Sequence, residues 1–317
     1  MSGTESGTID VVVVNWNAGP LLRDCLASLA GCANRADLRV VVIDNASHDG
    51  SADGLAISGL DLTVVRNRDN RGFARACNQG AALGRAQAVL FLNPDTSPDA
   101  DSLATARAAL MADPGTGIVG ARLIDGEGRT QRSCARTPGA ARLIAHTLFL
   151  DRILPTIPPH FMLDWDHAES RPVDAVMGAF LMIRRPLFER LGGFDERFFV
   201  YWEDADLCTR AGEAGLRVRH VAQARVHHRG QGTTEAVKDR RLFYFLRAQA
   251  LYAAKHHGRA AGLGVLATAF LVQLPIRFAR ALVHRAPSEA AAVWRAGRML
   301  LAAVPGMWPL VRGGKAR

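Results

Sequence analysis

The sequence has little cysteine and none in a paired arrangement. Five of its 317 residues are cysteine, no C-x-x-C spacing occurs, and the flanking residues are apolar or helical in pattern. The first ten residues are polar and contain no apolar signal-peptide core. We therefore expect a cytoplasmic protein with reduced, buried thiols at the positions Cys25, Cys32, Cys77, Cys134 and Cys208.

A second absence concerns cofactor binding. No G-x-G-x-x-G stands at the junction between the first strand-like run and the first helical pattern, so the dinucleotide-binding fingerprint is missing. We expect no NAD-dependent redox chemistry. The composition, 49% hydrophobic and 22% charged, is that of an ordinary globular protein with one large or two smaller domains.

Acidic residues are almost absent from the C-terminal quarter. Residues 238–317 contain 14 Lys and Arg but only Asp239 and Glu289, a net charge of +12. Because the whole chain carries +9, residues 1–237 carry about −3. A basic tail on a slightly acidic body predicts that the tail alone meets an anionic surface.

Apolar runs alternate with helical patterns through the first 125 residues. The order β-α-β-β-α-β-α-β predicts an α/β fold with a mostly parallel, doubly wound sheet. The expected strands are residues 9–14, 38–43, 62–65, 88–92, 117–123 and 173–184, and the expected helices are 20–29, 74–85, 104–111 and one that begins near Pro186.

Residues 135–172 break this alternation, because five prolines interrupt short apolar pieces there. We expect a long irregular segment of the kind that carries specificity.

The central apolar run, AVLFL at 88–92, stops at Asn93, Pro94 and Asp95. Ligands of open α/β sheets bind at the carboxyl edge of the strands, where a carboxylate can hold a divalent cation. Asp95 is therefore a candidate metal ligand. The alternative is that the three residues only form a turn.

Other strand ends carry similar candidates. Asp44 follows the second run and can accept hydrogen bonds from a base or a ribose, or it can form an Asx turn. Arg71 and Arg75 stand at the start of a small-residue helix and can meet phosphate, or they are solvated basic residues.

The segment FFVYWEDADLCTR, residues 198–210, places Glu203, Asp204 and Asp206 directly after aromatic residues. Clustered carboxylates raise one another's pKa and can supply a general base, and the aromatic faces suit a sugar ring. The alternative is that the carboxylates cap the following helix. His227 and His228 end the last strand and form either a structural pair or part of a metal site.

Six motifs in order carry a resemblance to a known family. They are VVVVNWN, VVVIDNASHDGS, NRGFARACNQG, LFLNPDT, MGAFLMIRRPLFERLGGFDERFFVYWEDADLCTRAGEAG and VHHRGQGT. Over residues 8–235 the chain resembles the family-2 inverting glycosyltransferases of the rhamnosyltransferase-like branch.

The resemblance implies a GT-A fold, with a nucleotide-sugar-binding half over 8–125, an acceptor-binding half over 126–237 and a helical basic extension over 238–317. It implies that Asp204, assisted by Glu203, takes the proton from the acceptor hydroxyl. It implies acceptor contacts at Trp202, Gly178 and Asp206. The donor residues that it implies are Asn17, Asp44, Asn70, Gly72, Asn78 and Asp95, and the metal ligands for Mg²⁺ or Mn²⁺ are Asp95 with His227 or His228.

One departure from the family bears on the donor. Many relatives carry Asp-x-Asp at the metal edge, whereas this chain has Asn93-Pro94-Asp95. The branch with Asn there resembles transferases that use dTDP-L-rhamnose. We therefore expect transfer of rhamnose to a lipid-linked glycan or another cell-envelope acceptor. The alternatives are a galactofuranosyl or N-acetylhexosaminyl donor, or a glycan-binding scaffold without turnover.

The tail has 17 consecutive residues without formal charge between Arg259 and Arg277, but glycine, threonine, glutamine and proline dilute them. About 20 predominantly apolar residues are needed to span a bilayer. We expect amphipathic helices lying on the inner leaflet, with Arg277, Arg280 and Arg285 toward anionic headgroups. A helical extension that packs on the core or builds a homo-oligomer is the alternative, and no nucleic acid is expected, since no aromatic stacking pattern is present.

Overall fold

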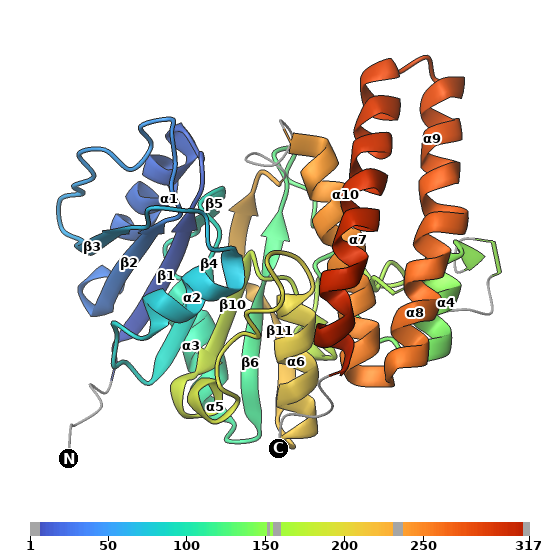
Figure 1. Ribbon diagram of the computed structural model, residues 1–317. Helices are drawn as coiled ribbons and strands as arrows, with labels where there is room; N and C mark the ends of the chain where they lie inside the picture. The colour runs from blue at the N-terminus through green and yellow to red at the C-terminus, as the bar shows by residue number, and fades with distance from the viewer. Residues whose placement is uncertain (1–6, 151–152, 155–159, 231–236, 313–317) are drawn as a thin grey trace. The chain divides into compact units, whose positions relative to one another are not determined.

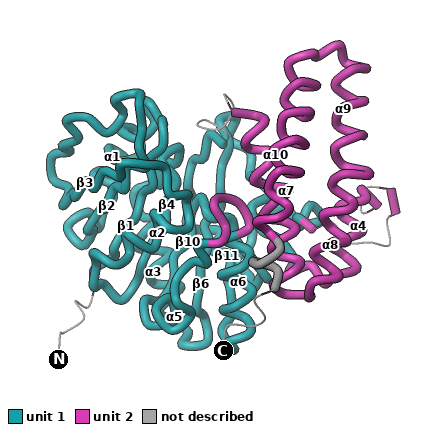
Figure 2. Tube along the Cα trace, viewed as in Figure 1, with its two compact units in different colours: residues 1–136, 161–196, 203–233 teal, residues 137–160, 197–202, 234–317 magenta. Residues whose placement is uncertain are grey.

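The computed structural model describes residues 7–150, 153–154, 160–230 and 237–312. The chain divides into two compact units (Figure 2). Unit 1 comprises residues 1–136, 161–196 and 203–233, and unit 2 comprises residues 137–160, 197–202 and 234–317. Parts of the predicted irregular segment and of the last motif, residues 151–152, 155–159 and 231–233, lie outside the described residues.

Unit 1 is built on one mixed, mostly parallel sheet (Figure 1). Among the described residues the strand order is β3-β2-β1-β4-β10-β6-β11-β5, with β8 paired to β11. The parallel pairs are β1 with β2 and β4, β2 with β3, and β6 with β11, whereas β10, β5 and β8 run antiparallel to their neighbours. The predicted α/β class is confirmed. The strands are β1 (Ile9–Asn15), β2 (Leu38–Asp44), β3 (Asp61–Arg66), β4 (Ala88–Leu92), β5 (Thr96–Pro98), β6 (Thr116–Ile124), β8 (Arg171–Val173), β10 (Phe180–Arg184) and β11 (Arg217–His228), and β7 (Cys134–Ala135) pairs separately with β9 (Ala175–Val176).

Different helices cover the two faces of this sheet. Successive residues of a strand point to opposite faces, so alternate valines of β1 pack against different helices. Val11 and Val13 pack in one core cluster with α1 and α3. Val12 and Val14 pack in the other with α2, α5 and α6, which lie on the near face in Figure 1. The helices are α1 (Pro20–Ala30), α2 (Phe73–Ala81), α3 (Ser102–Ala112), α5 (Arg185–Arg190) and α6 (Glu203–Glu213).

The strand predicted over 173–184 is wrong in extent. The structure has three short strands there, β8, β9 and β10, with breaks at Asp174 and at residues 177–179. The break at Gly178 has a local cause, since its N–H donates to the side chain of Asp204 at 2.8 Å instead of to a neighbouring strand.

A buried ion pair joins β1 to α5. Asp10 is 1% exposed, and its Oδ2 accepts hydrogen bonds from Arg185 Nη2 at 2.6 Å and from the Ala86 N–H at 2.7 Å. Arg185 also donates to the carbonyls of Ala81 and Ala86. The helix predicted to reach residue 85 ends at Ala81, and a Cβ on Gly84 would lie 2.1 Å from Asp10 Oδ2.

Hydrogen bonds of two histidines connect the segment before β8 to the rest of unit 1. His167 Nε2 accepts from the Cys134 N–H at 3.2 Å, and its Nδ1 donates to the Trp165 carbonyl at 3.0 Å. His220 Nε2 donates to the His167 carbonyl at 3.0 Å. Both rings are fully buried, and burial lowers the pKa of His167 and lowers that of His220 to about 4. Each ring is therefore neutral at pH 7, and the bond that His167 Nε2 accepts exists only in that state.

All five cysteine side chains are unpaired and buried, as predicted. Burial raises the pKa of Cys25 and Cys134 to about 12, so neither is a reactive thiolate at neutral pH.

Unit 2 is helical, which confirms the helical extension predicted at the C-terminus. His257 Nε2 donates to the Pro138 carbonyl at 2.7 Å, and Thr268 bonds Thr147 at 2.9 Å, so the C-terminal helices hold α4. The helices are α4 (Ala140–Thr147), α7 (Lys238–His257), α8 (Arg259–Thr268), the π-helical turn η4 (Ala269–Gln273), α9 (Leu274–Val283) and α10 (Pro287–Arg312). By length and composition alone, the continuous segment Arg259–Val283 could cross a membrane.

We expect Arg185→Met to lower the free energy of unfolding by about 3 kcal/mol, because it removes the hydrogen-bonded cation from the buried Asp10 carboxylate and leaves only Arg39, whose Nη1 lies 3.9 Å from Asp10 Oδ1. Arg217→Met, which breaks an exposed pair with Asp113, serves as the control and should cost less than about 1 kcal/mol. Urea unfolding of both variants at pH 7 measures the difference. Equal losses would contradict a special role for the buried pair.

We expect acid to weaken unit 1 through His220. A histidine whose pKa is lowered in the folded state binds its proton more readily when unfolded, so its stabilisation is complete above about pH 6.5 and falls progressively to about pH 4. The loss amounts to about 3 kcal/mol. Urea unfolding from pH 7 to 4.5 should show a steeper fall for the wild type than for His220→Gln, and parallel curves would refute this origin.

Candidate functional site

The polar residues that end β1 and β2 and those that follow β4 lie at one edge of the sheet. These strands are mutually parallel, and the register pairs Asn15 directly with Asp44. Asn93 follows β4 at the same end, and its N–H donates to the Ala179 carbonyl before β10 at 3.0 Å. The structure thus gathers side chains from distant sequence motifs at the carboxyl edge, where ligands of such sheets bind.

Asp44 is held by Asn15, a residue that the sequence analysis did not single out. Asn15 Nδ2 lies 2.8 Å from Asp44 Oδ1 and also reaches the hydroxyls of Ser47 and Ser51. Both Asn15 and Asp44 are buried, at 0% and 5% exposure. The signal that could have found Asn15 is its position as the last residue of a parallel strand.

Asn17 shapes the loop between β1 and α1. Its φ is 51°, a conformation that asparagine tolerates better than most residues. Its Oδ1 accepts from the His48 N–H at 2.8 Å, and its own N–H donates to Ser47 Oγ at 2.9 Å. Asn17 therefore fixes the loop backbone beside Asp44.

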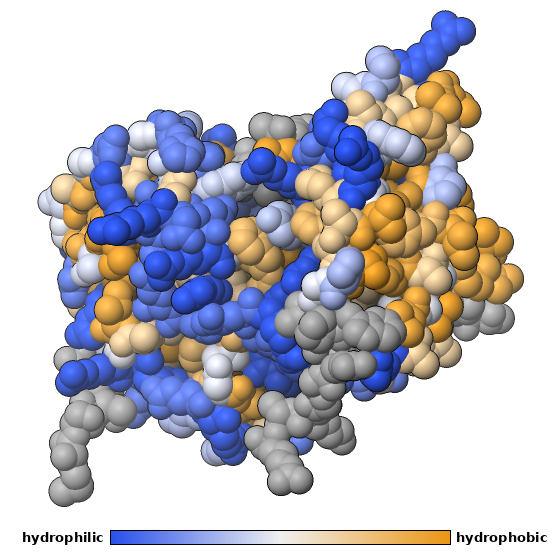
Figure 3. All heavy atoms as spheres, in the orientation of Figure 1, coloured by the Kyte–Doolittle hydropathy of each residue, from blue (hydrophilic) through white to orange (hydrophobic). Residues whose placement is uncertain are grey.

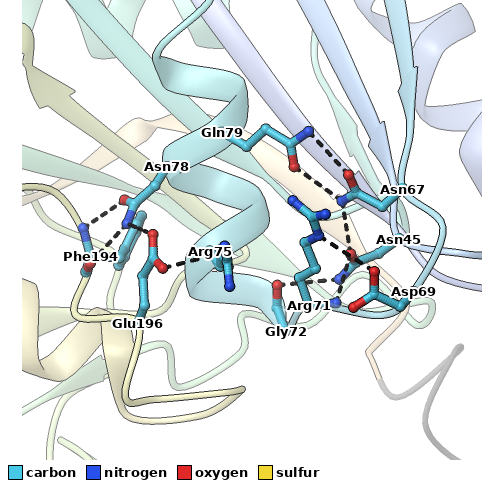
Figure 4. Close-up of polar contacts among 10 residues, drawn as sticks. All are labelled: Asn45, Asn67, Asp69, Arg71, Gly72, Arg75, Asn78, Gln79, Phe194 and Glu196. Carbon is cyan, nitrogen blue, oxygen red and sulfur yellow. Dashed lines mark hydrogen bonds and ion pairs between the residues drawn. The ribbon is translucent and has the colours of Figure 1, made fainter.

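An amide network centred on Asn45 holds the loop that precedes α2 (Figure 4). Asn45 Nδ2 donates to Asn70 Oδ1 and to the Gly72 carbonyl, while its Oδ1 accepts from Asn67 and from the Arg71 N–H. Asn70 and Gly72 were predicted from the sequence, whereas Asn45 was not. Its importance depends on contacts with residues 22 to 27 positions away.

Asn78 makes its contacts inside unit 1, with a loop far along the chain. Its side chain bonds both the N–H and the carbonyl of Phe194, and its Nδ2 also donates to Glu196. Arg75 pairs with Glu196 at 3.6 Å, and Arg71 pairs with Asp69 at 3.6 Å. Figure 4 shows both arginines between the Asn45 and Asn78 groups, and their side chains are 39% and 56% exposed for Arg71 and Arg75.

The structure distinguishes the two adjacent histidines, because they point to opposite faces of β11. His228 Nε2 lies 3.6 Å from Asp95 Oδ1, and both side chains are less than a tenth exposed. His227 is 54% exposed and faces Asp99 at 3.4 Å. Burial lowers the pKa of His228, whereas the nearby Asp95 raises it.

Asp95 and His228 together fit part of a divalent-cation site. They offer one carboxylate oxygen and one imidazole nitrogen at short separation. Among the residues that the structure describes, no group of three His, Cys, Asp or Glu side chains could hold a metal ion by itself. The donor set therefore suits a cation whose remaining ligands are phosphate oxygens and water.

Asp204 lies in the first turn of α6. Its Oδ2 accepts the Gly178 N–H at 2.8 Å and its Oδ1 accepts the Ala205 N–H at 2.7 Å. Burial raises the pKa of Asp204, although these two N–H groups lower it. A partly exposed carboxylate with a raised pKa is suited to accept a proton.

The two other carboxylates of this motif have different surroundings. Glu203 is 5% exposed, and burial together with the charge of Asp204 raises the pKa of Glu203 well above its usual range. Asp206 is fully buried and pairs with Arg210, which donates in turn to the carbonyls of Leu191 and Gly193. Only Asp204 of the three retains partial exposure.

The backbone before α6 is unusual. Tyr201 and Trp202 have φ angles of 71° and 68°, a conformation that bulky residues rarely adopt. Such residues cluster at functional sites. Trp202 belongs to unit 2, where its ring is 5% exposed and stacks on His160 at 5.2 Å.

The sequence is similar to those of known glycosyltransferases. The family described as "Glycosyl transferase family 2" matches residues 10–192. The chain is 30% identical over 239 residues to an N-acetylglucosaminyl-diphospho-decaprenol L-rhamnosyltransferase of Mycobacterium tuberculosis, covering 71% of this chain and 77% of that protein. It is 28% identical to the O-antigen biosynthesis protein RfbC of Myxococcus xanthus, over 69% of this chain but only 17% of that protein.

Solved structures show the same fold. A mannosyltransferase from Pyrobaculum calidifontis, in complex with GDP-Man and Mn²⁺, matches 95% of this chain and 87% of its own with a TM-score of 0.53 at 21% identity. GalNAc-T7 with UDP, GalNAc and Mn²⁺ matches 78% of this chain and 47% of its own with a TM-score of 0.57 at 17% identity. The GT-A fold is therefore confirmed, and the chain belongs to glycosyltransferase family 2, with the rhamnosyltransferases among its relatives.

Proposed function

We propose that this glycosyltransferase moves L-rhamnose from dTDP-rhamnose to a lipid-linked glycan or another cell-envelope acceptor, with inversion at the anomeric carbon. The name of the Mycobacterium tuberculosis relative, N-acetylglucosaminyl-diphospho-decaprenol L-rhamnosyltransferase, contains both this sugar and a lipid-linked acceptor, and it supports the proposal. The Asn93-Pro94-Asp95 edge, expected for rhamnose transferases, supports the same donor.

One observation carries the proposal: the sheet brings Asp95 and Asp204 to the same edge. Asp95 follows β4 by three residues, and Asp204 is bonded to Gly178, which precedes β10 by two residues. Because β10 pairs antiparallel with β4, the end of β4 meets the start of β10, with Leu92 opposite Phe180. A cation ligand and a proton acceptor are what a one-step transfer from a sugar diphosphate requires.

Asp204 is the proposed general base. Its carboxylate takes the proton from the acceptor hydroxyl as that oxygen bonds to the anomeric carbon. The bond from this carbon to the diphosphate oxygen breaks, and its electron pair leaves with the nucleotide. Glu203 is buried, and burial with the neighbouring charge of Asp204 raises its pKa, so we propose that it assists by position instead of acting as the base.

Asp44, Asn17, Asn70, Gly72 and Asn78 are the proposed donor-side residues. Asp44 would accept hydrogen bonds from the nucleoside. Asn17, Asn70 and Gly72 hold the loops beside it, and Asn78 holds the loop of Phe194 and Glu196. Arg71 and Arg75 are half-exposed cations that suit the diphosphate.

Asp95 and His228 are the proposed ligands of Mg²⁺ or Mn²⁺, with His227 turned toward Asp99. When bound, the cation would neutralise charge on the leaving diphosphate. On the acceptor side, Gly178 acts by orienting Asp204, and Asp206 acts by anchoring α6 through Arg210. An acceptor contact from Trp202 stays a prediction.

We further propose that unit 2 binds the inner leaflet of the cell membrane. Five large apolar residues of the segment Arg259–Val283 are 42–79% exposed, and Figure 3 shows apolar side chains gathered along α8 and α9. Only 33% of the most apolar window of this segment is buried. The exposed residues are Leu263, Leu271, Ile276, Leu282 and Val283.

Charge favours a lipid surface over a second copy of the chain as the occupant of this face. Between Asp239 and Glu289 the sequence contains no carboxylate, whereas Arg280 and Arg285 are exposed. A two-fold interface would bring the same cations together, while anionic headgroups attract them. Because Val265 and Leu274 on the same segment are buried, the segment suits a position in the membrane plane instead of across it.

The test of the reaction is donor binding and slow hydrolysis on a panel of nucleotide sugars, with and without Mg²⁺ or Mn²⁺. We expect metal-dependent preference for dTDP-rhamnose over galactofuranosyl and N-acetylhexosaminyl donors. Asp204→Asn should reduce transfer by at least about 100-fold and leave donor affinity nearly unchanged. Loss of donor binding in that variant, or unchanged transfer, would remove Asp204 as the base.

The test of membrane binding is co-sedimentation with vesicles, with and without phosphatidylglycerol in phosphatidylcholine. We expect the double variant Leu271→Glu, Val283→Glu to bind at least about tenfold more weakly, since burying each apolar side chain contributes about 1.5–3 kcal/mol. Leu83→Glu changes an equally apolar residue of unit 1 that is 51% exposed and should bind as the wild type does. If sedimentation velocity shows a dimer for the wild type and a monomer for the double variant, the exposed apolar face binds a second copy of the chain instead of a membrane.

A further inference from the structure

Gln131 makes two hydrogen bonds to a single residue, His228. Its Nε2 donates to the His228 carbonyl oxygen at 2.7 Å, and its Oε1 lies 2.8 Å from His228 Nδ1. The chain separation of the pair is 97 residues. No motif in the sequence pointed to Gln131.

The backbone around Gln131 is fixed by the turn that follows β6. Asp125 accepts the N–H groups of Glu127 and Arg129 with its side chain, which closes the turn. The Gln131 N–H then donates to the Leu123 carbonyl at 2.8 Å, so the chain runs back along β6. Since β11 pairs with β6 at His227 and Ile124, Gln131 arrives beside the end of β11.

The backbone of His228 is fixed as well. His228 pairs with Thr96 in the antiparallel ladder between β11 and β5, and the following N–H, that of Arg229, donates to the Asp95 carbonyl at 3.1 Å. The His228 ring therefore has a defined position relative to Asp95 before any ligand binds.

The two bonds determine which ring nitrogen of His228 carries the proton. A backbone carbonyl can only accept, so the amide nitrogen of Gln131 must face it. The amide oxygen is then the atom beside His228 Nδ1, and because that oxygen can only accept, Nδ1 must be the donor. In the neutral ring the lone pair consequently lies on Nε2, the atom 3.6 Å from Asp95 Oδ1.

We infer that Gln131 is a positioning residue that holds His228 as its Nδ1–H tautomer, with the Nε2 lone pair aimed beside Asp95 as a ready ligand for a divalent cation. A ligating histidine is commonly oriented by an acceptor at its other ring nitrogen. This inference rests on the proposed metal role of Asp95 and His228.

The test combines a spectroscopic signature with metal affinity. Long-range ¹H–¹⁵N correlation spectra of histidine-labelled, metal-free protein, with His228 assigned through His228→Ala, report the tautomer. We expect Nδ1–H in the wild type and a mixture or Nε2–H in Gln131→Met. Binding of Mn²⁺ alone, followed by electron paramagnetic resonance, should be about 10–100-fold weaker in Gln131→Met.

Gln223→Met is the matched control. Gln223 lies on β11 with His228, but its side chain is exposed and accepts a hydrogen bond from Ser170 instead. It should change neither the spectrum of His228 nor Mn²⁺ affinity. An Nε2–H tautomer in the wild type, no Mn²⁺ binding by the wild type, or equal Mn²⁺ affinity in Gln131→Met would overturn the inference. If the wild type shows the Nδ1–H tautomer and Gln131→Met weakens Mn²⁺ binding, but the protein hydrolyses no nucleotide sugar, the proposed function is refuted and the inference about Gln131 stands.

Discussion

The parallel pairing of β2, β1 and β4 is the constraint on which the site depends. Parallel strands in register end at one edge, so whatever follows each strand is brought to a common place. The valines of β1 are buried on both faces, which ties this register to the core. A slip of one residue would exchange the two sets of buried valines and move Asn15 away from Asp44.

The antiparallel strand β10 brings the proposed base to this edge. It lies between β4 and β6 and begins where β4 ends, so that the residues before it adjoin those after β4. A Cβ on Gly178 would lie 3.5 Å from Asp204, an ordinary van der Waals separation, so this contact does not itself require glycine. The Gly178 N–H donates to the Asp204 carboxylate where the strand is interrupted, and this bond orients the proposed base.

Neutral and charged polar groups have different tasks in unit 1. Away from the site edge, Asp10 and Arg185 form a buried ion pair that fastens the opposite ends of the same strands. At the site edge, amides and hydroxyls such as Asn15, Asn45 and Gln131 hold the loops, together with the carboxylate of Asp49, which accepts the N–H groups of Gly19 and Ser51. A neutral group fixes the backbone without adding charge beside the carboxylates and arginines that are proposed to bind the metal and the anionic donor.

The sequence by itself determined the class of fold, the ends of the parallel strands to within one residue and the family, because these depend on local periodicity, on turn residues and on ordered motifs; the extent of the strand predicted over 173–184 was wrong. Asp44, Asp95 and Asp204 could be named from strand and helix boundaries alone. The tertiary structure decided which candidates share an edge, that His228 and not His227 lies beside Asp95, and that Asp206 is fully buried. It also supplied Asn15, Asn45 and Gln131. Their contacts join residues 22 to 97 positions apart, and such pairs are set by register between strands, which no local pattern encodes.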